Sequence, residues 1–225
     1  MPVFMLGPRA QALQPLLTGF AIGVMAVASV VGLLLPAFDE GSAGSVVLGL
    51  ALGMGFLVVA RRAIGARDVH IGRLAGRNVR TSVLVFLVLL VHSLPEGFAI
   101  GTAYASDTAG LAPFVILAIA IQNIPEGTSV AIPMQAAGFG KMQQFWAAVG
   151  TSAPQPVGAL IAFALVEEIQ SLLPISFGFA AGAMLALVVI ELVPVAFRRS
   201  TWRGATAGTV IGAAVMVALS AVLGV

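Results

Sequence analysis

The sequence contains no cysteine and few charged residues. The absence of cysteine excludes disulfide bonds and thiolate metal sites, and leaves methionine as the soft metal ligand. Only 9% of the 225 residues are Asp, Glu, Lys or Arg, whereas a soluble domain carries about a quarter, so a water-soluble globular protein is excluded. The pI of about 9.9 rests on a net charge of only +2, which gives no support for binding to nucleic acid.

Most of the sequence consists of long runs of apolar residues. Hydrophobic residues make up 60% of the chain, and the mean hydropathy is +1.08. A membrane-spanning helix needs about 20 apolar residues, and suitable runs occur at 15–37, 43–60, 81–105, 111–133, 143–166, 172–197 and 204–225. These runs are continuous rather than alternating, which argues against membrane strands. The sequence predicts an all-α, polytopic bundle of seven spans in the lipid bilayer, with residues 1–225 as one transmembrane domain.

The basic residues predict the orientation of this bundle. They fall before the first run or in the loops that follow the second, fourth and sixth runs: Arg9; Arg61, Arg62, Arg67, Arg73, Arg77 and Arg80; Lys141; and Arg198, Arg199 and Arg203. The positive-inside rule therefore places the N-terminus in the cytoplasm and makes residues 61–80 a basic cytoplasmic loop. The compact chain without a transit peptide indicates the inner membrane of a bacterium-like cell.

Ionisable side chains within the spans are the first sign of function. They are His92, Glu96, Glu126 and Glu191. Burial of such a group in a membrane costs about 2.5–3.5 kcal/mol or more unless the group is partnered, so these residues mark ion or proton pathways by default.

A repeated motif contains three of these residues. The chain reads VHSLPEG at 91–97 and IQNIPEG at 121–127. His92 and Glu96 are four residues apart and share one helix face, and Gln122 and Glu126 repeat this spacing. Consecutive spans are antiparallel, so the two faces can meet near the middle of the membrane. Each proline also removes an amide donor and frees a carbonyl on its own helix.

A divalent cation explains this gathering of polar groups. One neutral imidazole and two carboxylates become neutral together when they bind a 2+ ion, and this ligand set suits zinc or, with more oxygen ligands, Fe²⁺, Mn²⁺ or Co²⁺. The alternatives are a structural proline kink and a proton-carrying or helix-pairing glutamate. The sequence has no HExxH, GxSxG or phosphate-loop motif, so we do not expect an enzyme.

The two motifs resemble the signature fourth and fifth helices of the ZIP (Zrt/Irt-like) divalent metal transporters, nearest to the GufA-like bacterial branch. Residues 19–36, GFAIGVMAVASVVGLLLP, are similar to the family's second helix, and residues 180–194, AAGAMLALVVIELVP, to its seventh. The resemblance implies metal ligands at His92, Glu96, Gln122, Glu126 and Met25. It also implies uptake toward the cytoplasm, a homodimer and an elevator-like movement, with Cd²⁺ a further possible substrate.

The chain departs from the family in two respects. The family has eight helices, and the first has no counterpart here, so the first apolar run corresponds to the family's second helix. Many relatives place Asn and two acids at a second metal position where this chain has Ser93, Asn123 and Gln155. Because these replacements remove negative charge, we expect one metal ion, held by His92, Glu96 and Glu126.

Three further residues are weaker candidates for the metal pathway. By resemblance, Glu191 is an exit or transient ligand and Asp39 an acid at the outer mouth, whereas the alternatives are a partner for a backbone donor and a surface charge. His70 lies in the basic loop and could capture released metal, but a solvated loop residue is the simpler interpretation.

The sequence therefore predicts a membrane transporter that moves a divalent transition metal, foremost Zn²⁺, into the cytoplasm. One rival is a membrane metal sensor or assembly subunit that binds the ion without transporting it. The other is a proton-linked carrier of organic solutes. Metal uptake by purified protein in liposomes separates these hypotheses.

Overall fold

The computed structural model describes residues 9–65, 77–198 and 200–225, with side chains for 12–64, 82–198 and 200–225. The predictions for His70, Arg67, Arg73 and Arg199 lie outside the described residues, as do the side chains of Arg9, Arg77 and Arg80.

Helices account for nearly all of the described chain, and seven of the continuous helical stretches are long and apolar enough to cross a membrane. In chain order the elements are α2 (Arg9–Ser29), η1 (Val30–Leu34) and α3 (Leu35–Glu40); α4 (Ala43–Gly65); α5 (Arg77–Ala105); α6 (Leu111–Ala136); α7 (Lys141–Thr151) and α8 (Pro154–Glu168); η2 (Gln170–Leu172), α9 (Leu173–Leu187), η3 (Val188–Leu192) and α10 (Val193–Ala196); and α11 (Trp202–Leu223). The predicted all-α bundle of seven spans is confirmed.

The helix bounds differ from the prediction at the basic loop. α4 continues to Gly65 and α5 begins at Arg77, so both ends of the expected loop at 61–80 are helical. The long apolar stems of arginine can lie along a helix while the charged heads reach water, which lets α4 continue past Arg61 and Arg62. The centre of the loop, 66–76, is outside the described residues.

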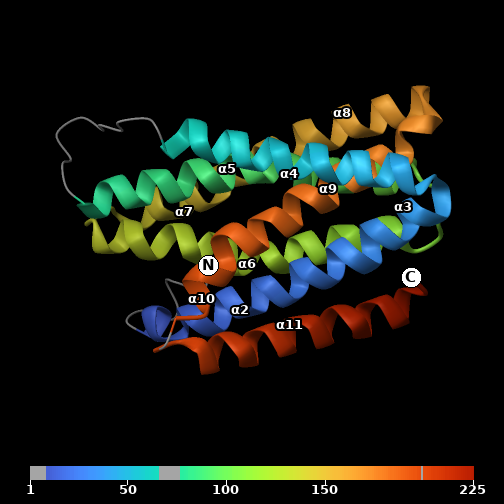
Figure 1. Cartoon of the computed structure of the whole chain (residues 1–225). Helices are drawn as coiled ribbons and strands as arrows, with labels where there is room; N and C mark the ends of the chain where they lie inside the picture. The colour runs from blue at the N-terminus through green and yellow to red at the C-terminus, as the bar shows by residue number, and fades with distance from the viewer. Residues whose placement is uncertain (1–8, 66–76, 199) are drawn as a thin grey trace.

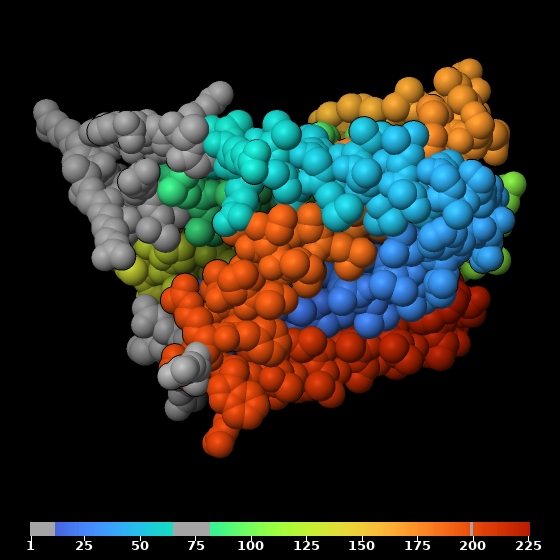
Figure 2. Space-filling model, viewed as in Figure 1, coloured from blue at the N-terminus to red at the C-terminus, as the bar shows by residue number. Residues whose placement is uncertain are grey.

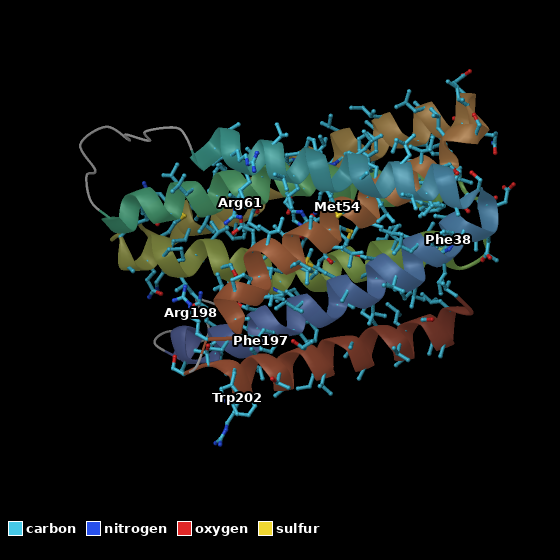
Figure 3. All side chains as sticks on the ribbon, viewed as in Figure 1. Phe38, Met54, Arg61, Phe197, Arg198 and Trp202 are labelled. Atoms are coloured by element: carbon cyan, nitrogen blue, oxygen red, sulfur yellow. The ribbon has the colours of Figure 1, made fainter. Side chains whose placement is uncertain are left out.

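The helices run up and down, so that alternate connections lie at the same end of the bundle (Figure 1). One end carries the basic residues for which side chains are described, and we name it the basic end: Arg61, Arg62, Lys141, Arg198 and Arg203. The opposite end, named the acidic end, carries Asp39, Glu40, Asp107, Glu167 and Glu168. Figure 3 shows Arg61 and Arg198 toward one end and Phe38 at the other. Basic and acidic residues, which occupy alternate connections along the sequence, therefore lie at opposite ends of the bundle.

Glycines bring three pairs of helices into close contact: α2 with α11, α4 with α9, and α5 with α8. A Cβ added to Gly19, Gly53 or Gly97 would lie only 2.0, 2.0 or 2.2 Å from a carbonyl oxygen of the facing helix. Such close approach is a common way of packing helices in lipid, where burial of apolar surface does not drive association. In Figure 2 the α9–α10 segment lies between α4 and α2 on the visible face.

Two helices contain a π-helical turn directly before a proline. In η1 the amide of Leu35 donates to the carbonyl of Val30, one residue before Pro36, and in η3 the amide of Val193 donates to that of Val188, one residue before Pro194. A proline ring clashes with the carbonyl four residues back, and a wider turn makes room for it.

The predicted span at 143–166 is one membrane crossing made of two helices. α7 ends at Thr151 and α8 begins at Pro154, where the fixed backbone angle of proline suits a first helical position. The break places Gln155 in the first turn of α8, beside the centre of the bundle.

Candidate metal centre

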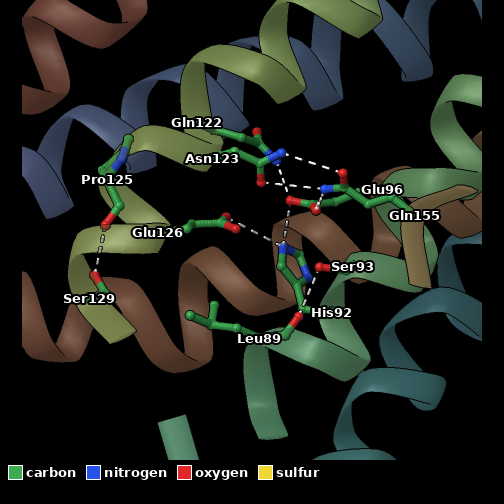
Figure 4. Close-up of polar contacts among 10 residues, drawn as sticks. All are labelled: Leu89, His92, Ser93, Glu96, Gln122, Asn123, Pro125, Glu126, Ser129 and Gln155. Carbon is green, nitrogen blue, oxygen red and sulfur yellow. Dashed lines mark hydrogen bonds and ion pairs between the residues drawn. The ribbon is translucent and has the colours of Figure 1, made fainter. Parts of the chain in front are cut away.

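The two repeated motifs meet in the middle of the bundle. α5 and α6 continue unbroken through Pro95 and Pro125, and their facing sides bring His92, Glu96 and Glu126 together (Figure 4). His92 and Glu96 are 0% exposed and Glu126 is 7% exposed. The helix-face spacing in the sequence therefore correctly predicted that these side chains converge.

The distances within the group are short enough for its members to share one metal ion. His92 Nε2 lies 3.3 Å from Glu96 Oε1 and 3.9 Å from Glu126 Oε1. One ligand atom from each of the three residues lies within 4.8 Å of the other two. A zinc ion lies about 2.0–2.2 Å from its nitrogen and oxygen ligands, so atoms spaced in this way can surround one ion.

Several buried polar atoms of this centre have no hydrogen-bond partner among the described residues. They are His92 Nε2 and Nδ1, Gln122 Oε1 and Glu126 Oε1. Leaving a buried polar group unpaired costs about 1–3 kcal/mol. In the part of the chain with described side chains, no Lys or Arg forms an ion pair with Glu96 or Glu126. A cation bound between His92 Nε2 and the two carboxylates would give Nε2 and Glu126 Oε1 a partner and would neutralise the carboxylates.

Glu96 is held by two amide side chains. Gln122 Nε2 of α6 donates to Glu96 Oε1, and Gln155 Nε2 of α8 donates to Glu96 Oε2 at 2.5 Å. The N-terminal end of α8 also carries a partial positive charge that favours a nearby anion. Three helices thus fix the orientation of this carboxylate.

The residues at the position where many relatives place a second metal form hydrogen bonds within the protein. Asn123 and Gln155 exchange two long hydrogen bonds, of 3.4 and 3.3 Å, and Ser93 Oγ donates to the carbonyl of Leu89 at 3.1 Å. Gln155 reaches Glu96 only because α8 begins next to the motif, and no sequence spacing between residues 96 and 155 reveals this contact.

The remaining candidates lie apart from these contacts. Met25 is fully buried in the main hydrophobic cluster, and its role as a ligand stays a prediction. Asp39 is exposed on α3 at the acidic end. Glu191 lies in η3 and forms an ion pair with Arg61 of α4, a partner that the sequence analysis missed because it assigned Arg61 to a loop.

A cavity of about 490 Å³ extends from the centre toward the basic end. Its wall comprises residues between 14 and 21 of α2, 84 and 89 of α5, 125 and 136 of α6, and 187 and 195 of α9, η3 and α10. Glu126 lies at its inner limit, because the lining residues of α5 and α6 run from the motif to the basic end of those helices. The cavity therefore reaches the centre at Glu126, whereas His92 and Glu96 do not line it.

The opposite side of the centre is closed by tight packing. Phe114 and Phe177 are fully buried between the motif and the acidic end, as are Ala99 and Ala103 of α5. The hydroxyls of Thr102 and Ser176 form a buried hydrogen bond of 2.5 Å between α5 and α9. An ion at the centre thus faces a cavity on the basic side and a packed core on the other.

Comparison with known proteins assigns the chain to a family. The family model described as ZIP Zinc transporter matches residues 65–220. Zinc transporter ZIPB of Bordetella bronchiseptica is 34% identical over 228 residues, which cover 94% of this chain and 72% of that protein. Zinc transporter GufA of Myxococcus xanthus is 30% identical over 149 residues, 66% of this chain and 59% of that protein.

An Arabidopsis thaliana protein is 32% identical over 206 residues, which cover 90% of this chain. The chain spans only 33% of the length of that plant protein. The family match covers most of the sequence, including both motifs and the helix that carries Glu191, and the relatives agree with the resemblance drawn from the motifs. This multi-pass membrane protein belongs to the ZIP zinc transporter family.

Proposed function

We propose that this protein carries divalent transition metal ions across a membrane, one at a time, through a centre formed by His92, Glu96 and Glu126. Zn²⁺ is the first candidate substrate because a single imidazole with carboxylates suits it, and because the named relatives are zinc transporters. Fe²⁺, Mn²⁺, Co²⁺ and Cd²⁺ are the competitors to test. Gln122 Oε1 and Met25 complete the proposed ligand set.

The unpaired buried atoms of the centre are the observation that supports this proposal most directly. The carboxylates of Glu96 and Glu126 and one imidazole nitrogen of His92 converge within 4.8 Å of one another, and His92 Nε2 and Glu126 Oε1 have no hydrogen-bond partner among the described residues. A transported ion supplies the missing partner, and two carboxylates match its charge. The amides that occupy Glu96 favour a single ion, because they take up lone pairs that a second cation needs.

The cavity suggests how the ion leaves. It joins Glu126 to the basic end of the bundle while the acidic side is packed. By the positive-inside rule the basic end is cytoplasmic, so this arrangement is the inward-facing one and net movement is uptake. Alternating access then requires the helices around the centre to shift against the rest of the bundle. The same rule places the N-terminus and the loop at 61–80 in the cytoplasm.

Two proposals concern the setting of the protein. A bacterial inner membrane agrees with the bacterial relatives, ZIPB and GufA. A homodimer follows from the family resemblance alone, and the mass of the protein in nanodiscs tests it.

Liposome uptake tests the transport proposal. Purified protein is reconstituted with a zinc-sensitive dye inside, and the wild type is compared with Glu96→Gln and Glu126→Gln, which keep the shape of the side chain but remove its charge. Glu168→Gln, at an exposed acid of the acidic end, is the matched control. We expect uptake in the wild type and the control and loss of uptake in the two variants.

Two other outcomes favour the rivals. Metal binding without uptake by any of the proteins indicates a sensor or assembly subunit. Solute uptake driven by pH alone and unaffected by zinc indicates a proton-linked carrier.

A further inference from the structure

The ion pair between Arg61 and Glu191 joins two helices near the basic end. Arg61 Nε of α4 contacts Glu191 Oε1 of η3, and Figure 3 shows Arg61 near the basic end of the bundle. The side chains are 47% and 25% exposed. An arginine is always protonated in proteins, so the pair brings one permanent positive charge to one carboxylate.

Glu191 also lines the cavity that begins at the metal centre. Among the lining residues, Glu126 and Glu191 are the ones with ionisable side chains, and most of the others are apolar. An ion that leaves Glu126 through this cavity therefore passes a second carboxylate. The guanidinium of Arg61 contacts that carboxylate.

The sister π-helical turn shows that the fold does not require an acid at this position. The sequences VVGLLLP at 30–36 and VVIELVP at 188–194 align without gaps, and Leu33 stands where the second turn has Glu191. Leu33 is fully buried in the main hydrophobic cluster, whereas Glu191 borders the cavity. The π-helical turn therefore forms with leucine at this position as well as with glutamate, so Glu191 and its ion pair with Arg61 are not needed to form the turn.

We propose that Arg61 is the fixed counter-charge that keeps the exit cavity electrically balanced, so that the metal ion can leave the centre. This inference rests on the proposed transport function. Without Arg61, the unpaired Glu191 carboxylate makes the cavity more negative and retains a divalent cation. Without Glu191, the unpaired guanidinium makes the cavity more positive and opposes the arrival of the ion. The balanced pair avoids both effects.

Four proteins that differ in the charges at positions 61 and 191 test this proposal against the alternative that the ion pair only holds α4 and η3 together. The proteins are the wild type, Arg61→Gln, Glu191→Gln and the double variant Arg61→Gln/Glu191→Gln, all in nanodiscs. The dissociation constant and the dissociation rate of Zn²⁺ are measured by titration and stopped flow, and thermal stability is measured for each protein.

The expected order follows the charge of the pair. Arg61→Gln binds Zn²⁺ about 3- to 10-fold more tightly than the wild type and releases it more slowly, because one negative charge acts across the cavity. Glu191→Gln binds about 3- to 10-fold more weakly, and the double variant returns to the wild-type affinity. High salt reduces these differences, because both side chains reach solvent.

The competing outcome is distinct. If the ion pair only holds α4 and η3 together, all three variants lose the same contact. Their affinities for Zn²⁺ then shift in the same direction, and the double variant does not return to the wild-type affinity. That result overturns the charge-balance proposal while the wild type still binds and transports zinc. A wild type that binds no ion contradicts the transport function itself, and the charge-balance proposal is rejected with it.

Discussion

The two Pro-Glu-Gly turns have the same sequence but different surroundings. On α5, Glu96 is completely buried and both of its oxygens accept amide hydrogens, from Gln122 and Gln155. On α6, Glu126 lines the cavity and its Oε1 has no hydrogen-bond partner among the described residues. Two hydrogen bonds hold the Glu96 carboxylate, whereas Glu126 Oε1 accepts none.

The difference also holds for the glycines that follow. A Cβ on Gly97 would lie 2.2 Å from the carbonyl oxygen of Gln155, whereas a Cβ on Gly127 would meet only the Cβ of Ala148, at 3.6 Å. The Gly97 turn is therefore pressed against α8, and the Gly127 turn is loosely surrounded. We infer that Glu96 is the permanent ligand and that Glu126 is the one that exchanges as the ion enters and leaves.

Truncating the two glutamates gives the largest expected effects. Glu96→Ala and Glu126→Ala both lower zinc uptake by at least about 100-fold, because each removes a charged ligand from the centre. Their thermal stability should differ. Glu96→Ala removes the acceptor of two amide hydrogen bonds and lowers the melting temperature, whereas Glu126→Ala removes a carboxylate whose Oε1 accepts no hydrogen bond and leaves the melting temperature unchanged or higher. Uptake assays and melting curves of purified protein check both parts. A larger loss of stability in Glu126→Ala contradicts the division of roles.

Replacing each of the two glycines with alanine compares how tightly the two Pro-Glu-Gly turns are packed. Gly97→Ala forces α5 and α8 apart against backbone atoms, and overpacking of this kind costs about 1–3 kcal/mol. Gly127→Ala meets an ordinary van der Waals contact and gains about 0.8–1.0 kcal/mol of helix propensity, so its stability stays equal or rises. Unfolding in mixed detergent measures both changes. If the two variants are equally destabilised, the packing of Gly97 against α8 is no tighter than the packing of Gly127 against Ala148.

The convergence of His92, Glu96 and Glu126 was predictable from the sequence because it follows from helix periodicity. Residues four apart share a face, and consecutive spans are neighbours in space. The seven spans were predictable for a similar reason, since the apolar length needed to cross the bilayer is fixed.

The contacts of Gln155 and Arg61 were not predictable in this way. Gln155 reaches Glu96 because α7 and α8 break at Pro154 and glycines bring α8 against α5, and both effects depend on how distant helices cross. Arg61 was assigned to a loop because hydropathy ends a span at the first charged residue. The helix in fact continues to Gly65, and Arg61 forms an ion pair with Glu191 on another helix.

Removing the Gln155 amide reduces the difference between the two turns. Gln155→Leu keeps the volume of the side chain but leaves Glu96 Oε2 without this donor, so Glu96 gains some of the freedom of Glu126. We expect zinc to bind about 10- to 100-fold more weakly, because a hydrogen bond to a charged group contributes about 1.5–3 kcal/mol, with one ion still bound. Zinc titration measures affinity and stoichiometry together. Asn123→Leu is the matched control, because Asn123 contacts Gln155 rather than Glu96, and its effect should be smaller. Equal effects of the two variants would indicate that Gln155 acts only through packing.

The smallest expected effect concerns the hydroxyls beyond Glu126. Ser129 Oγ and Thr128 Oγ1 both donate to the carbonyl of Pro125, at 3.1 and 2.6 Å, whereas the matching positions after Glu96 are Phe98 and Ala99. Ser129 also lines the cavity. Ser129→Ala should change zinc uptake by less than about twofold, because Thr128 still donates to the same carbonyl and a single neutral hydrogen bond contributes only about 0.5–1.5 kcal/mol.

Initial uptake rates over a range of zinc concentrations measure the effect of Ser129→Ala. A larger fall that appears only in the maximal rate would mean that the Ser129 hydroxyl contacts the ion on its way out. The path of the departing ion would then include Ser129, one helical turn beyond Glu126. The two Pro-Glu-Gly turns would therefore differ in the residues of the cavity wall as well as in their carboxylates.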